Sequence, residues 1–246
     1  MYSFLYLFSD GSTGLLDKSI YGGGTKTPVG VVVSRSKRLA IALKNANNGA
    51  KVQWATNPSL NTWTNTNVYF YNDAMFRYDG EDETWNPANN RPNAGTVAKG
   101  DNNALFPAFY RAGHYSDELQ AAGISMTGTL SGKKWHLPAF GEMRLMTEAL
   151  GFAKPITPSS PVSDFYGQPW YPRLAEIAFT QVGGTSILLN DNSPLERYWT
   201  STDLNGGGGH APATTYLSTH NTYYGWNGGA AQHKTTFQYV RAFINY

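Results

Sequence analysis

The chain has 246 residues and no cysteine, which excludes disulfides, thiolate metal sites and a cysteine nucleophile. Aromatic residues make up 14%, charged residues only 15%, and the net charge is +2 without a basic run, so we expect a folded protein that binds no nucleic acid. No stretch reaches the roughly 18 apolar residues of a membrane-spanning helix, and residues 1–8 lack the basic segment of a signal peptide, so we expect neither.

The N-terminal part contains apolar or β-branched runs that predict strands. The first run is followed by Asp10-Gly11, which is a turn signal. The second and third runs are separated by a polar break at residues 35–37, which predicts a hairpin. These runs, together with a further short one, are residues 3–12, 27–36, 38–46 and 51–56.

The next part of the chain is dominated by loop residues. Residues 57–107 are rich in Asn, Thr, Asp, Gly and Pro, and we expect long loops there with one short helix near 72–78. Apolar residues at helical spacing then predict a helix within 105–122.

The clearest helix signal lies within residues 133–151. Pro138 is typical of a helix start, and Glu142 falls in the first turns. An apolar stripe follows, and Gly151 is a C-terminal stop signal.

The remaining C-terminal part alternates between loops and short elements. Residues 173–184 predict a short helix or strand that ends at a Gly-Gly pair. Alternating patterns predict strands at 197–203, 214–219 and 236–245. Because no repeat and no linker divides the sequence, we expect one α+β domain, residues 1–246, with few helices and much irregular structure.

Polar clusters offer little catalytic chemistry. Asp79 and residues 81–83 are acidic, but general acid–base work needs burial at a set separation, so we interpret them as a solvated loop. Residues 190–196 lack the spacing of a calcium-binding loop and are interpreted as an Asn/Asp turn. The histidines form no helical i, i+4 pair, and His136 is interpreted as structural. We predict no catalytic residues, no metal site, no cofactor and no enzymatic activity.

The C-terminal region differs from the rest of the chain. Between residues 205 and 246 the charged side chains are Lys234 and Arg241, while aromatic and small residues are frequent. Residues 220–236 have no regular apolar period, and Tyr, Trp, Gly, Ser and Asn together are typical of binding loops. We therefore predict a ligand-binding surface here. Its candidate residues are His220, Asn221, Tyr223, Tyr224, Trp226, Asn227, His233, Thr235, Thr236 and Phe237.

Three motifs occur in order along the chain. They are GKKWHLPAFGEMRLM at 132–146, YWTSTD at 198–203 and KTTFQYVRAF at 234–243. Together with the N-terminal runs and YDGEDET at 78–84, they resemble the C-type-lectin-like domains of Bacteroidales surface and phage proteins. The resemblance spans nearly the whole chain. It implies a C-type-lectin-like fold of small antiparallel sheets, two main helices and much irregular loop structure.

Some members of that group are similar to the variable proteins of diversity-generating retroelements, whose fold displays a rewritten C-terminal cassette as a ligand-binding surface. The resemblance places the end of that cassette at residues 234–241 and implies that 205–238 is the variable region. The implied function is receptor binding in a phage tail fibre or adhesion at the bacterial cell surface. The partner would be a bacterial surface protein or glycan, and a homotrimer is an option if the chain belongs to a tail fibre.

Two other functions remain open. The first is an undiversified adhesin or fimbrial-tip domain with one fixed partner. The second is a glycan-active enzyme, which would require Asp79, Glu81 or Glu83 to lie together in a cleft. Formylglycine-generating enzymes and calcium-dependent lectins share the fold, but the chain lacks the cysteines of the former and the Trp-Asn-Asp acid of the latter.

The resemblance also implies how the chain packs. The first strand, near residues 6–8, should lie beside the last strand, near 240–243, because such domains bring their termini together. The side chains expected in the core are Trp135, Leu137, Leu145, Trp199 and Val240.

Overall fold

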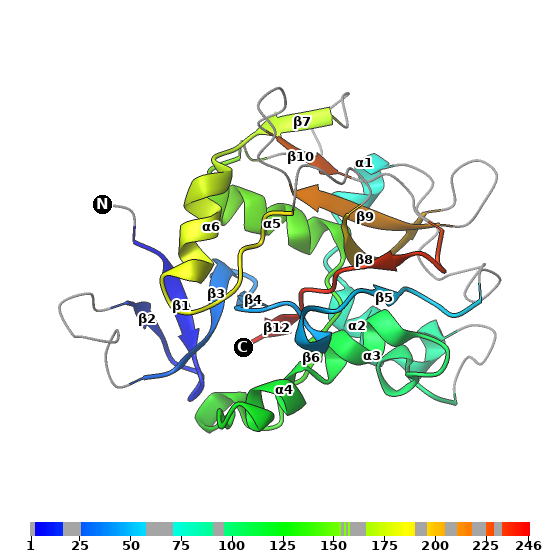
Figure 1. Cartoon of the computed structure of the whole chain (residues 1–246), viewed down its shortest axis with the longest axis horizontal. Helices are drawn as coiled ribbons and strands as arrows, with labels where there is room; N and C mark the ends of the chain where they lie inside the picture. The colour runs from blue at the N-terminus through cyan, green and yellow to red at the C-terminus, as the bar shows by residue number, and fades with distance from the viewer. Residues whose placement is uncertain are drawn as a thin grey trace.

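The computed structural model describes most of the polypeptide (Figure 1). The described residues are 3–16, 26–57, 71–90, 96–153, 155, 157, 166–189, 196–204, 211–217, 225–228 and 233–246. For residues 71–72, 166–169, 204, 211–217 and 225–228 the description covers the backbone.

In the described part of the chain, six strands form one antiparallel sheet in the order β2-β1-β3-β4-β12-β6. Its strands are β1 (Leu5–Phe8), β2 (Thr13–Leu15), β3 (Pro28–Ser34), β4 (Leu39–Ala42), β12 (Phe243–Asn245) and β6 (Trp135–His136). The predicted hairpin is confirmed, because β3 and β4 pair across a turn in which Arg38 has a φ of 50°. The predicted turn after the first strand is also confirmed, with Gly11 at a φ of 83°.

Successive residues of the central strands enter two different cores, because side chains alternate between the faces of a sheet. In β3, Val31 and Val33 pack into the core on one face and Val32 into the core on the other. In β1, Tyr6 and Leu7 divide in the same way. A sheet covered on both faces explains why residues 28–33 form a continuous apolar run instead of an alternating one.

Helices cover both faces of this sheet (Figure 1). The core on one face includes α5 (Phe140–Gly151) and α6 (Pro172–Thr180), and the core on the other includes α3 (Pro107–Gly113) and α4 (Tyr115–Ala121). The shorter helices are α1 (Tyr71–Ala74), α2 (Gly80–Trp85) and the 3-10 turns η1 (Asn47–Gly49), η2 (Pro87–Asn89), η3 (Lys99–Asp101) and η4 (Gly128–Leu130). The predicted α+β class is confirmed.

Two smaller sheets stand beside the main one. Over the described ranges, β7 (Tyr166–Pro169), β10 (Gly225–Gly228), β9 (Ala211–Leu217) and β8 (Tyr198–Leu204) pair antiparallel in that order. The short strands β11 (Phe237–Gln238) and β5 (Val52–Gln53) form the other pair. A parallel bridge between Tyr198 and Tyr239 connects β8 to the C-terminal segment.

Helix α5 begins as its sequence predicts. The carboxylate of Glu142 accepts a hydrogen bond from the N–H of Ala139 at 2.8 Å and closes the first turn. The same carboxylate lies 3.2 Å from Nε2 of His136, and both side chains are buried. His136 therefore has the structural position that was predicted for it.

The end of α5 differs from the prediction. Phe152, with a φ of 52°, adopts the left-handed conformation that terminates the helix, whereas Gly151 is the last helical residue. The ring of Trp170 packs where a Cβ atom of Gly151 would lie. Glycine is therefore required at 151 for close packing and not for reversing the chain.

Two expectations about strand order are wrong. β1 and β12 belong to one sheet but are not neighbours, because the hairpin of β3 and β4 lies between them. The single strand predicted at 236–245 is divided into β11 and β12, which belong to different sheets, because residues 240–242 enter the core between them. Helix α2 was not predicted, and α1 corresponds to the short helix expected near 72–78.

The predicted core is largely confirmed. Trp135, Leu137, Trp199 and Val240 are fully buried, and Leu145 is half-buried against the core that contains α5. In the part of the chain that the structure describes, no helix has the length and apolar character needed to cross a bilayer.

Tyr6 connects β1 to α6, and its titration tests that contact. Its hydroxyl donates to the carbonyl of Ala178 at 2.7 Å and accepts from the side chain of Gln181. Burial raises the pKa of Tyr6 from 10.0 to about 12. The folded state thus favours the neutral phenol, so its stabilising effect is complete below pH 10 and is lost as the pH rises to 12.

We expect Tyr6→Phe to lower the free energy of unfolding at neutral pH by about 1 kcal/mol. The variant should also lose less stability than the wild type between pH 10 and 12, as measured by urea unfolding. The same loss in both proteins over this range would show that the Tyr6 phenol is not the titrating group.

Candidate functional site

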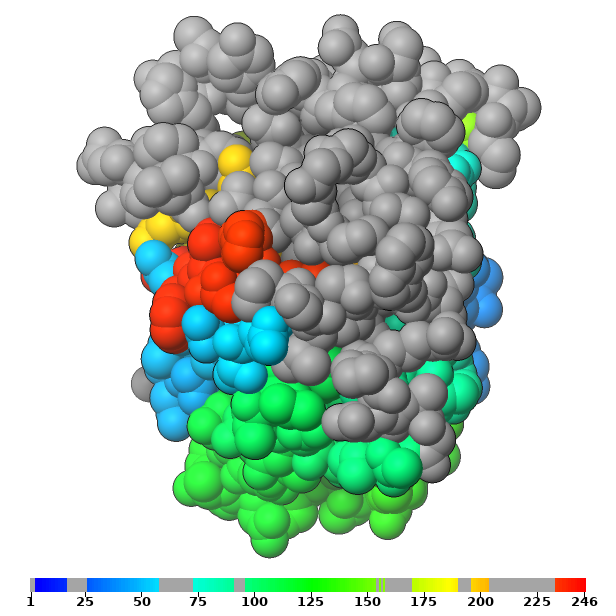
Figure 2. All heavy atoms as spheres, turned by 90° about the vertical axis from the view of Figure 1, so that its right-hand side faces the viewer, coloured from blue at the N-terminus to red at the C-terminus, as the bar shows by residue number. Residues whose placement is uncertain are grey.

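Residues 233–239 cross the surface beside β5, and residues 233–237 are called here the exposed tract. Figure 2 shows C-terminal residues (red) at the surface next to light blue residues of segment 26–57. Phe237 pairs with Gln53 in the β11–β5 ladder, and Gln53 Nε2 donates to the carbonyl of Thr235 at 2.9 Å. The exposed tract is therefore held by its backbone groups.

Lys234 fixes the N-terminal part of the exposed tract to the protein interior. Its fully buried ammonium lies 2.7 Å from Oδ2 of Asp203 and 4.8 Å from the centre of the Trp54 ring. Its carbonyl accepts hydrogen bonds from the N–H groups of Trp54 at 2.9 Å and Ala55 at 3.1 Å. Both the side chain and the backbone of Lys234 are thus bound to the protein interior.

Gln238 fixes the other end of the exposed tract. Its side chain is buried, and its Oε1 accepts from the N–H of Arg197 at 2.8 Å. The N–H of Tyr239 donates to the carbonyl of Arg197, and its carbonyl accepts from the N–H of Trp199, both at 2.9 Å. These bonds join the segment to the start of β8.

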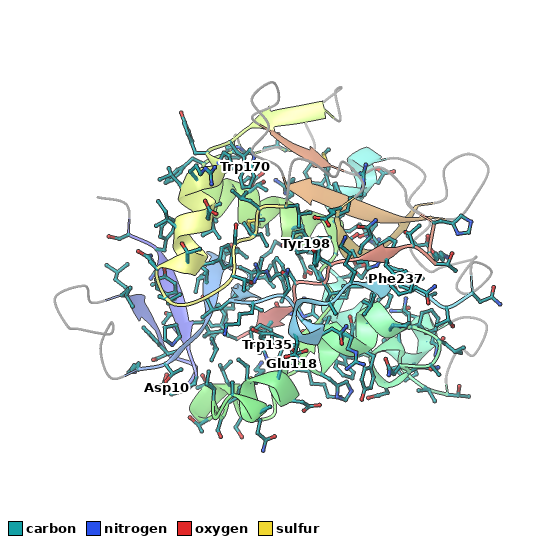
Figure 3. The ribbon with its side chains drawn as sticks, in the orientation of Figure 1. Asp10, Glu118, Trp135, Trp170, Tyr198 and Phe237 are labelled. Carbon is teal, nitrogen blue, oxygen red and sulfur yellow. The ribbon has the colours of Figure 1, made fainter. Side chains whose placement is uncertain are left out.

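The side chains between these two buried anchors, and that of His233 just before Lys234, are partly or largely exposed. Phe237 is 60% exposed, His233 is exposed, and Thr235 and Thr236 are half-buried. Phe237 lies at the right-hand side of Figure 3, the side that faces the viewer in Figure 2. The side-chain hydrogen bonds of His233, Thr235 and Thr236 stay within the tract, at 3.2 Å for His233 Nδ1 to Thr235 Oγ1 and 2.8 Å for Thr236 Oγ1 to the His233 carbonyl.

A buried ionic cluster that sequence reasoning missed lies beneath the exposed tract. Lys99 and Glu83 pair at 2.9 Å, and Lys99 Nζ is 5.7 Å from the centre of the Trp54 ring. The Trp54 ring therefore lies within cation–π distance of two ammonium groups, since Lys234 is near it as well. Burial lowers the pKa of Lys234, Asp203 opposes that shift, and Lys99 adds to it. The available signal was Lys234 itself, a lone charge in a stretch of neutral residues.

The acidic cluster is not a solvated loop, which corrects the prediction for Glu83. Helix α2 turns Glu83 inward, and burial raises the pKa of its carboxyl, with the neighbouring lysine opposing the shift. Asp79 pairs with Arg77, and Glu81 accepts from Asn245 Nδ2 at 2.6 Å. Glu83, Asp79 and Glu81 thus each interact with a different side chain, so each carboxylate has its own structural partner. Among the described side chains, no group of three His, Asp or Glu gathers to hold a metal ion.

The structure describes some of the predicted ligand-binding residues and not others. Trp226 and Asn227 lie on β10, where Trp226 is opposite Gln168 of β7 and Leu217 of β9. The structure brings His233, Thr235, Thr236 and Phe237 together in the exposed tract. The candidates outside the described residues are His220, Asn221, Tyr223 and Tyr224. Most of 205–232 and residues 190–195 of the oxygen-rich segment also fall outside them.

The sequence matches no protein-family model and no curated protein. A solved structure with a similar fold is that of a fimbrial protein from Bacteroides ovatus, with a TM-score of 0.54 and 14% sequence identity. The match covers 100% of this chain and 49% of the fimbrial protein, so the chain spans about half of that protein's length.

Removing one partner of the Lys234–Asp203 pair tests the anchor. Lys234→Met leaves the Asp203 carboxylate buried without its cation, so we expect the free energy of unfolding to fall by about 3–5 kcal/mol in urea unfolding. Adding Asp203→Asn to Lys234→Met should recover most of that loss, because both charges are then removed.

The matched control is the exposed pair of Arg173 and Glu176, in which the arginine side chain is 73% exposed. Arg173→Met should change stability by less than about 1 kcal/mol. If Lys234→Met were as mild as this control, Lys234 would not anchor the exposed tract.

Proposed function

We propose that the chain is a non-enzymatic, fimbrial-type adhesion domain of the bacterial cell surface that binds an extracellular protein or glycan through the exposed tract. The observation that carries this proposal is the position of Phe237. Its ring is 60% exposed, although it stands on a strand whose backbone and neighbouring side chains are fixed. Aromatic side chains held in this way are typical anchors of a binding surface.

Rigidity of the tract supports this function in energetic terms. A binding loop that must first become ordered loses affinity, because each immobilised side chain and backbone segment costs free energy. The exposed tract is already ordered, since Lys234 and Gln238 are buried at its two ends and β5 pairs with it. A partner would therefore meet a preformed surface with an exposed aromatic ring, two threonines and an imidazole.

The fold comparison supports a fimbrial-type surface protein, since the similar structure is described as a fimbrial protein. The chain corresponds to about half of that protein, so we assign to it the role of a domain and not of a whole fimbrial subunit. The C-type-lectin-like resemblance of the sequence motifs adds to this proposal, because domains of that kind bind protein and glycan ligands.

Diversification of the same surface is a second candidate function, and one observation favours it. Within the described part of the chain, the side chains of His233, Thr235 and Thr236 form hydrogen bonds inside the tract and Phe237 has no polar group, whereas Lys234 and Gln238 bond to residues outside it. A surface built in this way would tolerate changes at its outward positions. In a phage tail fibre or a diversified adhesin, gene copies from one population would then differ mainly within residues 205–238, beside a reverse-transcriptase gene. Identical copies without such a gene would favour one fixed partner.

Alanine substitution at Phe237 tests the binding surface. We expect Phe237→Ala to weaken binding of the fluorescently labelled chain to intact Bacteroides cells by at least about tenfold, because a central aromatic anchor is lost. Flow cytometry over a concentration series measures the change, and a glycan array separates glycan from protein ligands. The melting temperature should stay unchanged because Phe237 is largely exposed.

Tyr171→Ala is the matched control, because Tyr171 is an aromatic side chain with 64% exposure at the start of α6. It should bind like the wild type. Equal binding by all three proteins would rule out the exposed tract as the binding surface, and equal weakening in both variants would show that the assay reports nonspecific adhesion.

A further inference from the structure

A second site lies in a cavity of about 430 Å³ on another part of the molecule. Its walls come from α4, from the start of β3, from the segment that follows β4 and from the segment that follows α6. Its apolar lining residues include Leu43, Leu119 and Val182, and its polar lining residues include Asn45 and Thr185. Its volume falls within the roughly 300–1,000 Å³ of small-molecule sites, which combine such apolar walls with a few polar groups.

A buried guanidinium lies behind the polar side of this cavity. Arg241 is fully buried and donates to Thr185 Oγ1 at 3.1 Å, to the Thr185 carbonyl at 2.9 Å and to the Ser186 carbonyl at 3.0 Å. Neutral acceptors thus surround it, and no described carboxylate forms an ion pair with it. A buried cation without an anionic partner is unfavourable, so an anion nearby would stabilise it.

Three buried polar groups close to Arg241, including Arg241 itself, pair with one another in poor hydrogen-bond geometry. Asn45 Oδ1, Tyr198 Oη and Arg241 Nε are buried and make no hydrogen bond of good geometry in the described structure. The Tyr198 hydroxyl lies beside both Asn45 and Arg241. An Asn side chain carries both an acceptor oxygen and a donor NH₂ group, so rotation of the Asn45 amide can present either one here. Asn45, which lines the cavity, thus belongs to a buried polar cluster whose hydrogen bonds are poorly formed, and a polar ligand group in the cavity would give Asn45 a better partner.

Two hydroxyl groups can donate into the cavity. Thr185 Oγ1 accepts from Arg241, and Tyr115 Oη accepts from the N–H of Lys44 at 3.3 Å, so the hydrogen of each hydroxyl remains for another acceptor. Burial raises the pKa of Tyr115 and of Tyr198, which keeps both phenols protonated at neutral pH.

Glu118 is the acidic residue among the described lining residues, and its carboxylate already accepts hydrogen bonds from the backbone. Its carboxylate accepts from the N–H of Asn47 at 2.6 Å and from the N–H of Asn48 at 3.1 Å. Lys44 lines the same cavity with an exposed side chain. The lining therefore combines apolar side chains with the cation of Lys44 and with hydrogen-bond donors, and the buried Arg241 lies next to it through its bonds to Thr185.

We propose that this cavity binds a small organic carboxylate, with its apolar body against Leu43, Leu119 and Val182 and its carboxylate at Asn45 and Thr185. Arg241 acts as a positioning residue, because it holds Thr185 and supplies the positive field. The inference does not rest on the function proposed above, since the lining contains no residue of the exposed tract.

Phenylacetate and its neutral isostere phenylacetamide test the proposal on the intact chain by titration calorimetry and NMR. Phenylacetate should bind, and phenylacetamide should bind at least about tenfold more weakly, because charge-assisted hydrogen bonds are roughly twice as strong as neutral ones. Acetate, which lacks the apolar body, should also bind more weakly. Equal affinity for the acid and the amide, or no binding of phenylacetate at tens of millimolar, would overturn the proposal.

Asn45→Asp provides the sharpest variant, because it places a carboxylate of the same shape where the ligand's carboxylate would lie. We expect it to weaken phenylacetate binding by at least about tenfold, without lowering the melting temperature, since Arg241 gains a counter-charge. Asn48→Asp is the matched control, because Asn48 is an exposed residue of the same lining, and it should weaken binding by less than about threefold. Unchanged binding in Asn45→Asp would overturn the proposal.

If Asn45→Asp fails to fold, Ala122→Trp provides a second test of whether the ligand binds in this cavity. Ala122 is an exposed lining residue at the end of α4, so a larger side chain there blocks the cavity without changing its charges. Phenylacetate should no longer bind to this variant. Retained binding would show that the ligand lies elsewhere.

Discussion

The buried pair of Lys234 and Asp203 is the interaction on which the C-terminal surface depends. It joins the start of the exposed tract to β8, over the ring of Trp54. A buried ion pair contributes little net stability compared with an apolar pair, but breaking one partner is strongly destabilising. Its main effect here is therefore to fix one position for the tract. With Gln238 bound to Arg197 at the other end, the residues between can face solvent without holding the fold.

The sequence predicts the parts of the fold that follow from local pattern. The β3–β4 hairpin and the start of α5 rest on neighbouring residues, and the structure confirms them. It also confirms the burial of Trp135 and Trp199, which the resemblance implied. The order of strands depends on contacts between distant segments. The separation of β1 from β12 could not be predicted for this reason, because the inserted hairpin changes the neighbours without changing either strand's own pattern.

The candidate site shows the same division. Low charge and missing periodicity predict a binding surface near the C-terminus, and Phe237 is exposed there, while binding by this surface stays a proposal. The buried charged residues beneath the exposed tract were harder to predict, because a lysine or glutamate in a polar sequence is usually solvated. Glu83 and Lys99 are 16 residues apart and become partners only when α2 and η3 pack together. The fold similarity to a Bacteroides fimbrial protein then supports, as a proposal, an adhesive role for this surface.

The central claim is that the buried anchors, and not the outward side chains, hold the exposed tract in place. Hydrogen exchange at the amides of Trp54 and Ala55, which bind the Lys234 carbonyl, measures this most directly. A variant with Thr235→Asn, Thr236→Ser and Phe237→Tyr together should show the same protection at both amides as the wild type. Loss of protection at Trp54 and Ala55 in that variant would contradict the claim, because the outward side chains would then be part of what holds the tract.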